Sequence, residues 1–133
     1  MKRSELTEIF RETATAVGYA FHTGATHKAG GEVRAYPAVW LEPPVMKSCD
    51  GRNEGTVTYR ATLHLVTLAT MVGAESLREG LETDAMTLKR AVEQDARVSE
   101  VTAVACAPAT QTLTAHGDVS MTLTCDVKMW YYL

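Results

Sequence analysis

The sequence has little charge excess, few aromatic residues and no long apolar run, and each shortage excludes a class of protein. Its 133 residues carry a net charge of −3, whereas a protein that neutralises nucleic-acid phosphates shows a basic excess. No stretch approaches the 18 apolar residues of a membrane-spanning helix. The amino-terminal Met1–Arg3 is followed by polar Ser4 and Glu5, which is not typical of a signal peptide. We therefore expect neither nucleic acid nor membrane as a partner.

Cysteine is also scarce, with three residues: Cys49, Cys106 and Cys125. An odd number without regular spacing does not indicate a disulfide framework. We expect Cys106 and Cys125 to be reduced thiols in the core of the protein, and Cys49 to be exposed in a loop. This usage favours the reducing cytoplasm.

No catalytic, cofactor or metal motif is present. The segment Gly24–Gly31 superficially resembles a phosphate loop but lacks its Gly-Lys-Ser/Thr ending. His22 and His27 could share a metal with Glu32, but their spacing in a glycine-rich loop fixes no geometry. Glu42 and Glu54 could act as general acid and base across a hairpin, although acids in loops are usually solvated. We predict no catalytic, cofactor-binding or metal-binding residues, and hence no enzyme.

The segment Gly55–Ala69 alternates apolar and polar residues and predicts a long, half-buried strand. Its apolar face carries Val57, Tyr59, Ala61, Leu63 and Leu65. Such a strand spans about 45 Å, whereas a domain of this size is about 36 Å across. The strand must therefore bend or extend beyond the domain, and a neighbouring copy is the simplest cover for the excess.

Five further elements are predicted from periodicity and turn signals. The helices are Glu5–Val17 and Ala74–Arg97, and the strands are Val33–Glu42, Val98–Ala107 and Val119–Tyr131. Each helix has one core-facing stripe at helical spacing: Leu6, Ile9, Phe10, Thr13 and Val17 in the first, and Leu77, Leu81, Ala85, Leu88 and Val92 in the second. Tyr19–Phe21 could start a further short strand. Pro37 indicates that the strand Val33–Glu42 lies at a sheet edge or has at least one unpaired position. A hairpin loop of about ten residues follows it. We interpret Gly80, inside the second helix, as allowing close packing on the sheet.

These elements predict one domain, residues 1–133, of class α+β. The expected order is α-β-β-α-β-β, with a four-stranded, mostly antiparallel sheet and two helices on one face. The other sheet face carries Thr58, Arg60, Thr62, Ser120, Thr122 and Thr124. That face is either solvated or meets another subunit.

The chain ends in the aromatic run Trp130-Tyr131-Tyr132 before Leu133. Its apolar surface is either the end of a strand packed into the core or an interface patch, since aromatics are enriched at interface centres. The candidate oligomer-interface residues are Thr58, Arg60, Thr62, Trp130 and Tyr132.

The order of elements resembles the tail terminator, or tail-completion, proteins of long-tailed bacteriophages and prophages. The matching features are an amphipathic helix and a loop, then Tyr36-Pro37-Ala38-Val39-Trp40-Leu41-Glu42. The strand Thr56–Leu65, the helix through Leu77 and Val92, and a closing hairpin ending in Val127-Lys128-Met129-Trp130 follow. The resemblance covers nearly the whole chain but contains no signature motif.

The resemblance implies a structural role. Proteins of this family form a ring, often of six subunits, that caps the tail tube and contacts head-completion proteins. It implies a location in the bacterial cytoplasm during assembly and in the virion afterwards. It carries over no catalytic residue.

Two other functions remain open. One is a small ferredoxin-like enzyme or ligand-binding domain with a site near the Tyr19–Glu32 loop, using His22, His27 and Glu32. The other is a nucleic-acid-binding sheet with Thr58 and Arg60 on its platform, which ranks last because that platform lacks stacking aromatics and positive charge.

Overall fold

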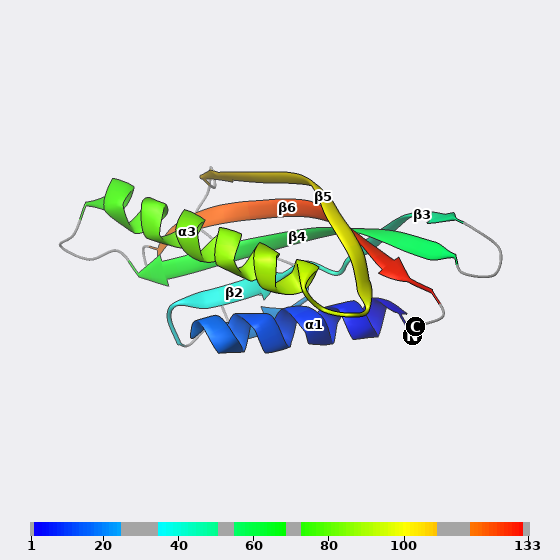
Figure 1. Ribbon diagram of the computed structural model, residues 1–133. Helices are drawn as coiled ribbons and strands as arrows, with labels where there is room; N and C mark the ends of the chain where they lie inside the picture. Colours follow the sequence, from blue (N-terminus) through cyan, green and yellow to red (C-terminus); the bar gives the residue numbers. More distant parts are fainter. Residues whose placement is uncertain (1, 25–34, 51–54, 69–72, 109–117, 132–133) are drawn as a thin grey trace.

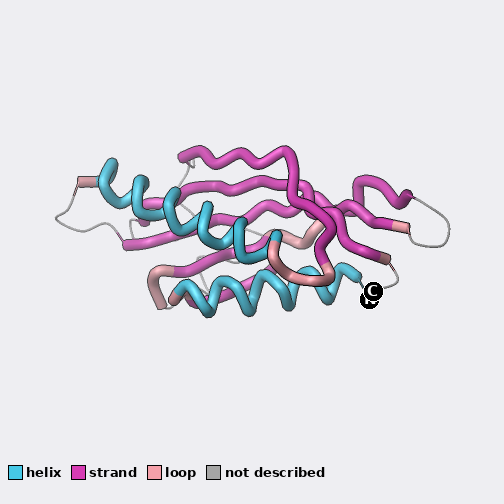
Figure 2. Tube along the Cα trace, in the orientation of Figure 1, coloured by secondary structure: helices cyan, strands magenta, loops and turns pink. Residues whose placement is uncertain are grey.

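Two helices pack on one face of a single sheet in a computed structural model that describes residues 2–24, 35–50, 55–68, 73–108 and 118–131 (Figures 1 and 2). In chain order the elements are α1 (Lys2–Val17), β1 (Ala20–Thr23), β2 (Ala38–Leu41), β3 (Val45–Asp50), β4 (Thr56–Leu68), α3 (Ala74–Glu93), β5 (Val98–Pro108) and β6 (Asp118–Trp130). The class is α+β, as predicted.

The sheet has six strands, so the prediction of four strands is wrong. The predicted order α-β-β-α-β-β differs as well, because four strands rather than two lie between the helices. Its order is β1-β2-β4-β6-β5, and β3 also pairs with β4. The β1–β2 pair is parallel, and every other pair is antiparallel. The two strands absent from the predicted sheet, β1 and β3, are short, with four and six residues, and short strands give weak periodicity.

The predicted ten-residue hairpin loop is also wrong, because β3 occupies most of it. β2 pairs with residues 63–66 of β4, and β3 pairs with residues 56–60 of the same strand. The two strands therefore lie end to end along one edge of β4. Pro43 and Pro44 separate them, because proline has no N–H group to donate to the ladder.

The expectation that the Pro37-containing strand lies at a sheet edge is not met. β2 lies between β1 and β4. Pro37 precedes the strand by one residue, and its carbonyl oxygen accepts a hydrogen bond from the amide of Ala20 at 3.0 Å. No amide is missing from the β2 ladder, since the strand begins at Ala38.

The core lies between the helices and one face of the sheet. α1 contributes Leu6, Ile9, Phe10 and Ala14, and α3 contributes Leu81, Ala85, Leu88 and Val92. Gly80 does not pack closely on the sheet as interpreted from the sequence. A Cβ atom at Gly80 would meet nothing within 4 Å, and the residue is exposed.

The two long strands outgrow the helices but are covered by their own chain. β4 and β6 each have 13 residues and pair along their whole length. That length is about 43 Å, against about 24 Å for α1 and about 30 Å for α3. Nevertheless Val57 and Tyr59, near the start of β4, are only 0% and 5% exposed. The expectation that a neighbour must cover this face of β4 is therefore wrong.

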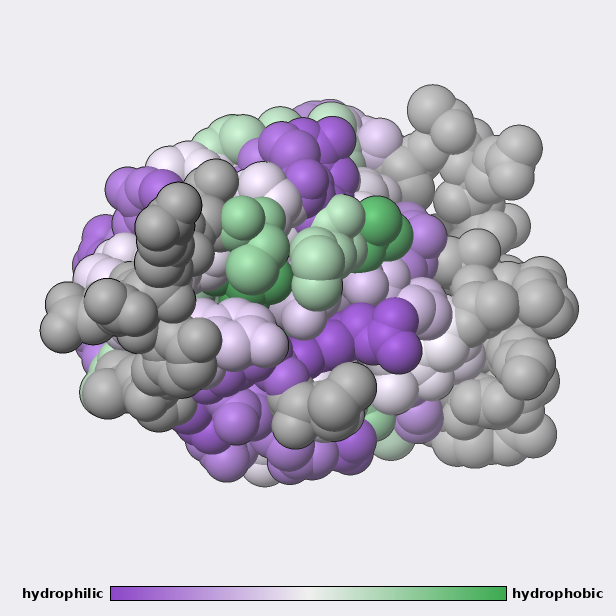
Figure 3. Space-filling view, turned by 90° about the vertical axis from the view of Figure 1, so that its right-hand side faces the viewer, coloured by the Kyte–Doolittle hydropathy of each residue, from purple (hydrophilic) through white to green (hydrophobic). Residues whose placement is uncertain are grey.

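Exposed apolar surface instead lies on β3. Val45 is 64% exposed and Met46 57%, the two largest values among large apolar residues of the described chain. The β3–β4 hairpin projects beyond the ends of both helices (Figure 1). Viewed from that end, apolar side chains gather near the middle of the surface, with hydrophilic ones around them (Figure 3).

Candidate functional site

The sheet face opposite α1 and α3, here called the open face, carries a row of polar side chains in register. Side chains of paired residues lie on the same face of a sheet. His64 pairs with Trp40 and Thr122, and Arg60 pairs with Asp126. The open face therefore collects charged and polar groups from β2, β3, β4 and β6.

One group on this face, the histidine cluster, consists of Glu42, His64 and Thr122. The Nε2 atom of His64 lies 2.7 Å from Glu42 Oε2, and its Nδ1 atom lies 3.2 Å from Thr122 Oγ1. A neutral imidazole satisfies both contacts if Nε2–H donates to the carboxylate and Nδ1 accepts from the hydroxyl. Through these side chains, the cluster links β4 and β6 to Glu42, the residue that follows β2.

The order of carboxylate, imidazole and hydroxyl is that of a proton relay, in which the imidazole activates a nucleophile. Acyl transfer also needs donors for an oxyanion, and these are usually free backbone amides. Thr122 lies in the middle of β6, whose ladders with β4 and β5 both include this residue. The geometry therefore supports a cross-strand link better than a nucleophile.

A second group, the aspartate cluster, consists of Lys47, Arg60 and Asp126. Asp126 is buried, and its carboxylate accepts hydrogen bonds from Arg60 Nε at 3.0 Å and Lys47 Nζ at 2.7 Å. The hydrogen bond from Arg60, aided by that from Lys47, lowers the pKa of Asp126 against the opposing effect of burial. Two cations share one anion, so the cluster presents a positive charge beside β3. Both cations are about half exposed.

The sequence did not identify either cluster. Glu42 and His64 are 22 residues apart, and Lys47 and Asp126 are 79 apart. The available signal was the polar alternation of the two long strands, which placed Arg60 and His64 on one face. Their partners follow only from strand pairing.

The predicted interface residues lie along this same face or at its end. Thr58 and Thr62 flank Arg60 on β4 and are partly exposed. Trp130, 39% exposed, pairs with Thr56 at the end of the sheet. Tyr132 lies outside the described residues.

Of the alternative site near Tyr19–Glu32, the structure describes only one part. The ring of His22 stacks on Trp40 with centroids 5.9 Å apart, and Trp40 Nε1 donates to the carbonyl of Gly24 at 2.9 Å. The Nε2 atom of His22 is buried and has no hydrogen-bond partner among the described residues. His27 and Glu32 lie outside the described residues, so the trio expected from the sequence is not seen together. The rest of the segment that resembles a phosphate loop, residues 25–31, lies outside them as well.

The other groups considered from the sequence lie apart. Glu54 is outside the described residues, so its pairing with Glu42 is not seen. Cys49 is exposed, Cys106 is partly buried and Cys125 is buried. Burial raises the pKa of the Cys125 thiol to about 12, which makes it a poor nucleophile at neutral pH.

Two features are absent from the described ranges: a metal-binding cluster and a membrane-spanning helix. No three His, Cys, Asp or Glu side chains there converge to hold a metal ion. Neither helix has the length and apolar character required to cross a membrane.

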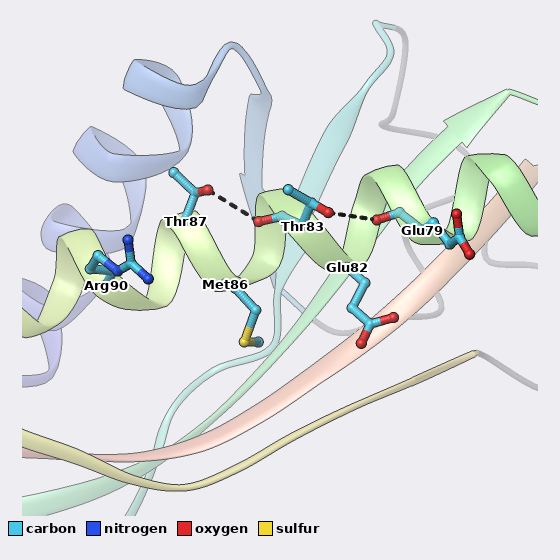
Figure 4. Close-up of a pocket in the computed structure, with 6 residues that line it drawn as sticks. All are labelled: Glu79, Glu82, Thr83, Met86, Thr87 and Arg90. Carbon is cyan, nitrogen blue, oxygen red and sulfur yellow. Dashed lines mark hydrogen bonds between the residues drawn. The ribbon is translucent and has the colours of Figure 1, made fainter.

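A shallow concavity lies along the exposed side of α3 (Figure 4). Its lining residues are Glu79, Glu82, Thr83, Met86, Thr87 and Arg90. The two threonine hydroxyls donate to carbonyl oxygens one turn earlier, at 3.0 and 3.1 Å. Their hydrogen bonds are thus satisfied within the helix, and Met86, at 36% exposure, is the largest apolar side chain there.

A comparison with protein-family models finds no match for the chain, and a comparison with curated protein sequences finds none either.

Proposed function

We propose that the chain is a structural assembly protein of the tail-terminator kind, whose copies form a ring that caps a phage or prophage tail tube. The observation that carries this proposal is the projecting β3–β4 hairpin, which exposes the apolar residues Val45 and Met46. Exposed apolar side chains on a projecting element are typical of contacts with another protein. The resemblance in element order supplies the identity of the assembly.

The open face supports the same proposal. Ion pairs and hydrogen bonds between its side chains fix their positions. Besides the two ion pairs of Asp126, a third joins Lys128 Nζ to Glu100 Oε1 at 3.1 Å. A pre-organised polar surface loses little side-chain freedom when a partner binds. We propose Thr58, Arg60, Thr62 and Trp130 as residues that contact other subunits, the tail tube or head-completion proteins.

The first test is the mass of the purified chain in solution. Mass photometry and sedimentation velocity are carried out at micromolar concentration, in low and high salt. Both are expected to show a discrete oligomer larger than a dimer. The resemblance implies six subunits. Negative-stain images of the same sample should show rings. A strict monomer in every condition contradicts the proposal.

The second test is the position of the gene. A structural tail protein is encoded among other tail and capsid genes, so these are expected on both sides of the coding sequence. Flanking genes that encode only metabolic enzymes would contradict the phage assignment while leaving self-assembly open.

A further inference from the structure

Two edge strands, β3 and β5, are each interrupted by a bulge. In β3 the register shifts between Met46 and Ser48, and in β5 it shifts between Thr102 and Ala105. The β5 bulge places Ala103 at a φ of 51°, a conformation that alanine rarely adopts. Bulges at edges obstruct the addition of a further strand. A contact between copies through β3 or β5 is therefore expected to depend on side chains rather than on sheet extension.

The hairpin offers a projecting surface with an apolar centre and positive charge. This surface, the hairpin patch, lies on the open face of the hairpin and consists of Val45, Lys47 and Arg60. Val45 pairs with Arg60, so both side chains lie on the open face. The side chain of Met46 lies on the opposite face beside Tyr59. Lys47 and Arg60 carry two positive charges and Asp126 one negative charge, so the three together have a net positive charge.

The concavity along α3 offers the complementary surface. Glu79 and Glu82 lie in it, and neither has an ion-pair partner within the described part of the chain. Figure 4 shows Glu82 and Met86 pointing to the same side of the helix, toward the space beside β5. The concavity is thus apolar at Met86 and negative toward the amino-terminal end of α3.

We infer that the hairpin patch of one copy docks into the concavity along α3 of a second copy. The occupant is another copy of this chain, because the two surfaces are opposite in charge, each has an exposed apolar side chain (Val45 on one, Met86 on the other), and they lie on different parts of the molecule. A contact between two different surfaces is heterologous, and it generates a ring when the rotation closes. The inference rests on the proposed function and names the interface that ring formation requires.

The test uses one variant for each surface and a matched control. Val45→Glu adds negative charge to the hairpin patch, and Met86→Glu adds it to a concavity that already contains Glu79 and Glu82. Leu68→Glu is the control, since Leu68 is an exposed apolar residue of β4 outside both surfaces. Circular dichroism and thermal unfolding verify that each variant is folded. Substituting one residue at the centre of an interface is expected to raise the concentration for half-assembly at least about tenfold, while the control assembles like the wild type.

Mixing the two variants tests whether the contact is head-to-tail. Each variant keeps one of the two surfaces, so the mixture is expected to form dimers through the remaining good pair and to stop there. If Val45→Glu blocks assembly and Met86→Glu does not, the hairpins contact each other and the inference is overturned. If the wild type assembles and both variants assemble equally well, the inference fails while the proposed function stands. A wild type that never assembles overturns both.

Discussion

Among single residues, Asp126 has the environment most sensitive to change. It is a buried carboxylate on the open face of the sheet, where Thr58 and Thr62 of the neighbouring strand are partly exposed. Burial of a charge is costly unless partners stabilise it, and here Arg60 and Lys47 provide that stabilisation from two different strands. Asp126 thereby ties β3 to β6 across β4. It also holds the cations that give the hairpin its positive charge.

Replacing this carboxylate by an amide (Asp126→Asn) is expected to lower the urea midpoint of unfolding at neutral pH, because two cations are left without their anion. The pKa of Asp126 is lower in the folded chain than its value of about 3.9 in an unfolded one. Its stabilising effect is therefore complete above that unfolded value and disappears as the pH falls through the lower folded value. As the pH is lowered, the urea midpoints of the wild type and the variant should converge.

Glu100→Gln is the control for this titration. Glu100 forms one ion pair, with Lys128, on the same face but is half exposed, and exposed pairs contribute little to stability. Its variant should differ little from the wild type at any pH. If the difference in urea midpoint between the wild type and Asp126→Asn were unchanged at acid pH, the role given to the ionised carboxylate would be contradicted.

Among the elements, α3 combines a regular core stripe with an outward side that is not optimised for helix stability. The buried residues Leu81, Ala85, Leu88 and Val92 follow helical spacing, and the sequence alone predicted this stripe. The interpretation of Gly80 failed, because a glycine's neighbours depend on where the helix lies on the sheet. Tertiary structure places Gly80 in open space. Its cost to helix stability therefore has no packing benefit.

Gly80→Ala is accordingly expected to raise the free energy of unfolding by about 0.5 to 1 kcal/mol, since alanine loses less backbone entropy in a helix. Chemical denaturation of wild type and variant measures this difference. Gly18→Ala is the matched contrast, because Gly18 has a φ of +96° and an alanine there is strained. The contrast variant should be less stable than the wild type. A destabilised Gly80→Ala would show that Gly80 has a packing role after all.

At the scale of the whole molecule, stability is expected to be greatest in the middle of the sheet. β4 and β6 pair with each other over all 13 residues, and their core-facing side chains are almost entirely buried. β3 and β5 pair on one side only and contain bulges. The proposed contact surface on β3 therefore lies on one of the least constrained strands of the sheet, where local rearrangement on binding is least costly.

Hydrogen exchange followed by mass spectrometry tests this gradient. Peptides from the centres of β4 and β6 are expected to exchange slowest, and those from β3 at least about tenfold faster, because edge amides open without global unfolding. In an assembled sample, protection should increase on β3 and α3 and remain unchanged on β6. Equal protection of β3 and β4 in the monomer would contradict the expected gradient.

The sequence by itself determined the local features of this protein: the faces of β4 and β6, the apolar stripes of α1 and α3, and the α+β class. These follow from periodicity, which neighbouring residues along the chain express. Only the tertiary structure decided that β2 is interior, that β3 continues along β4 beyond Pro43 and Pro44, and that Glu42 meets His64. Those features depend on which strands pair and in which register, and that is fixed by contacts between residues far apart in the chain.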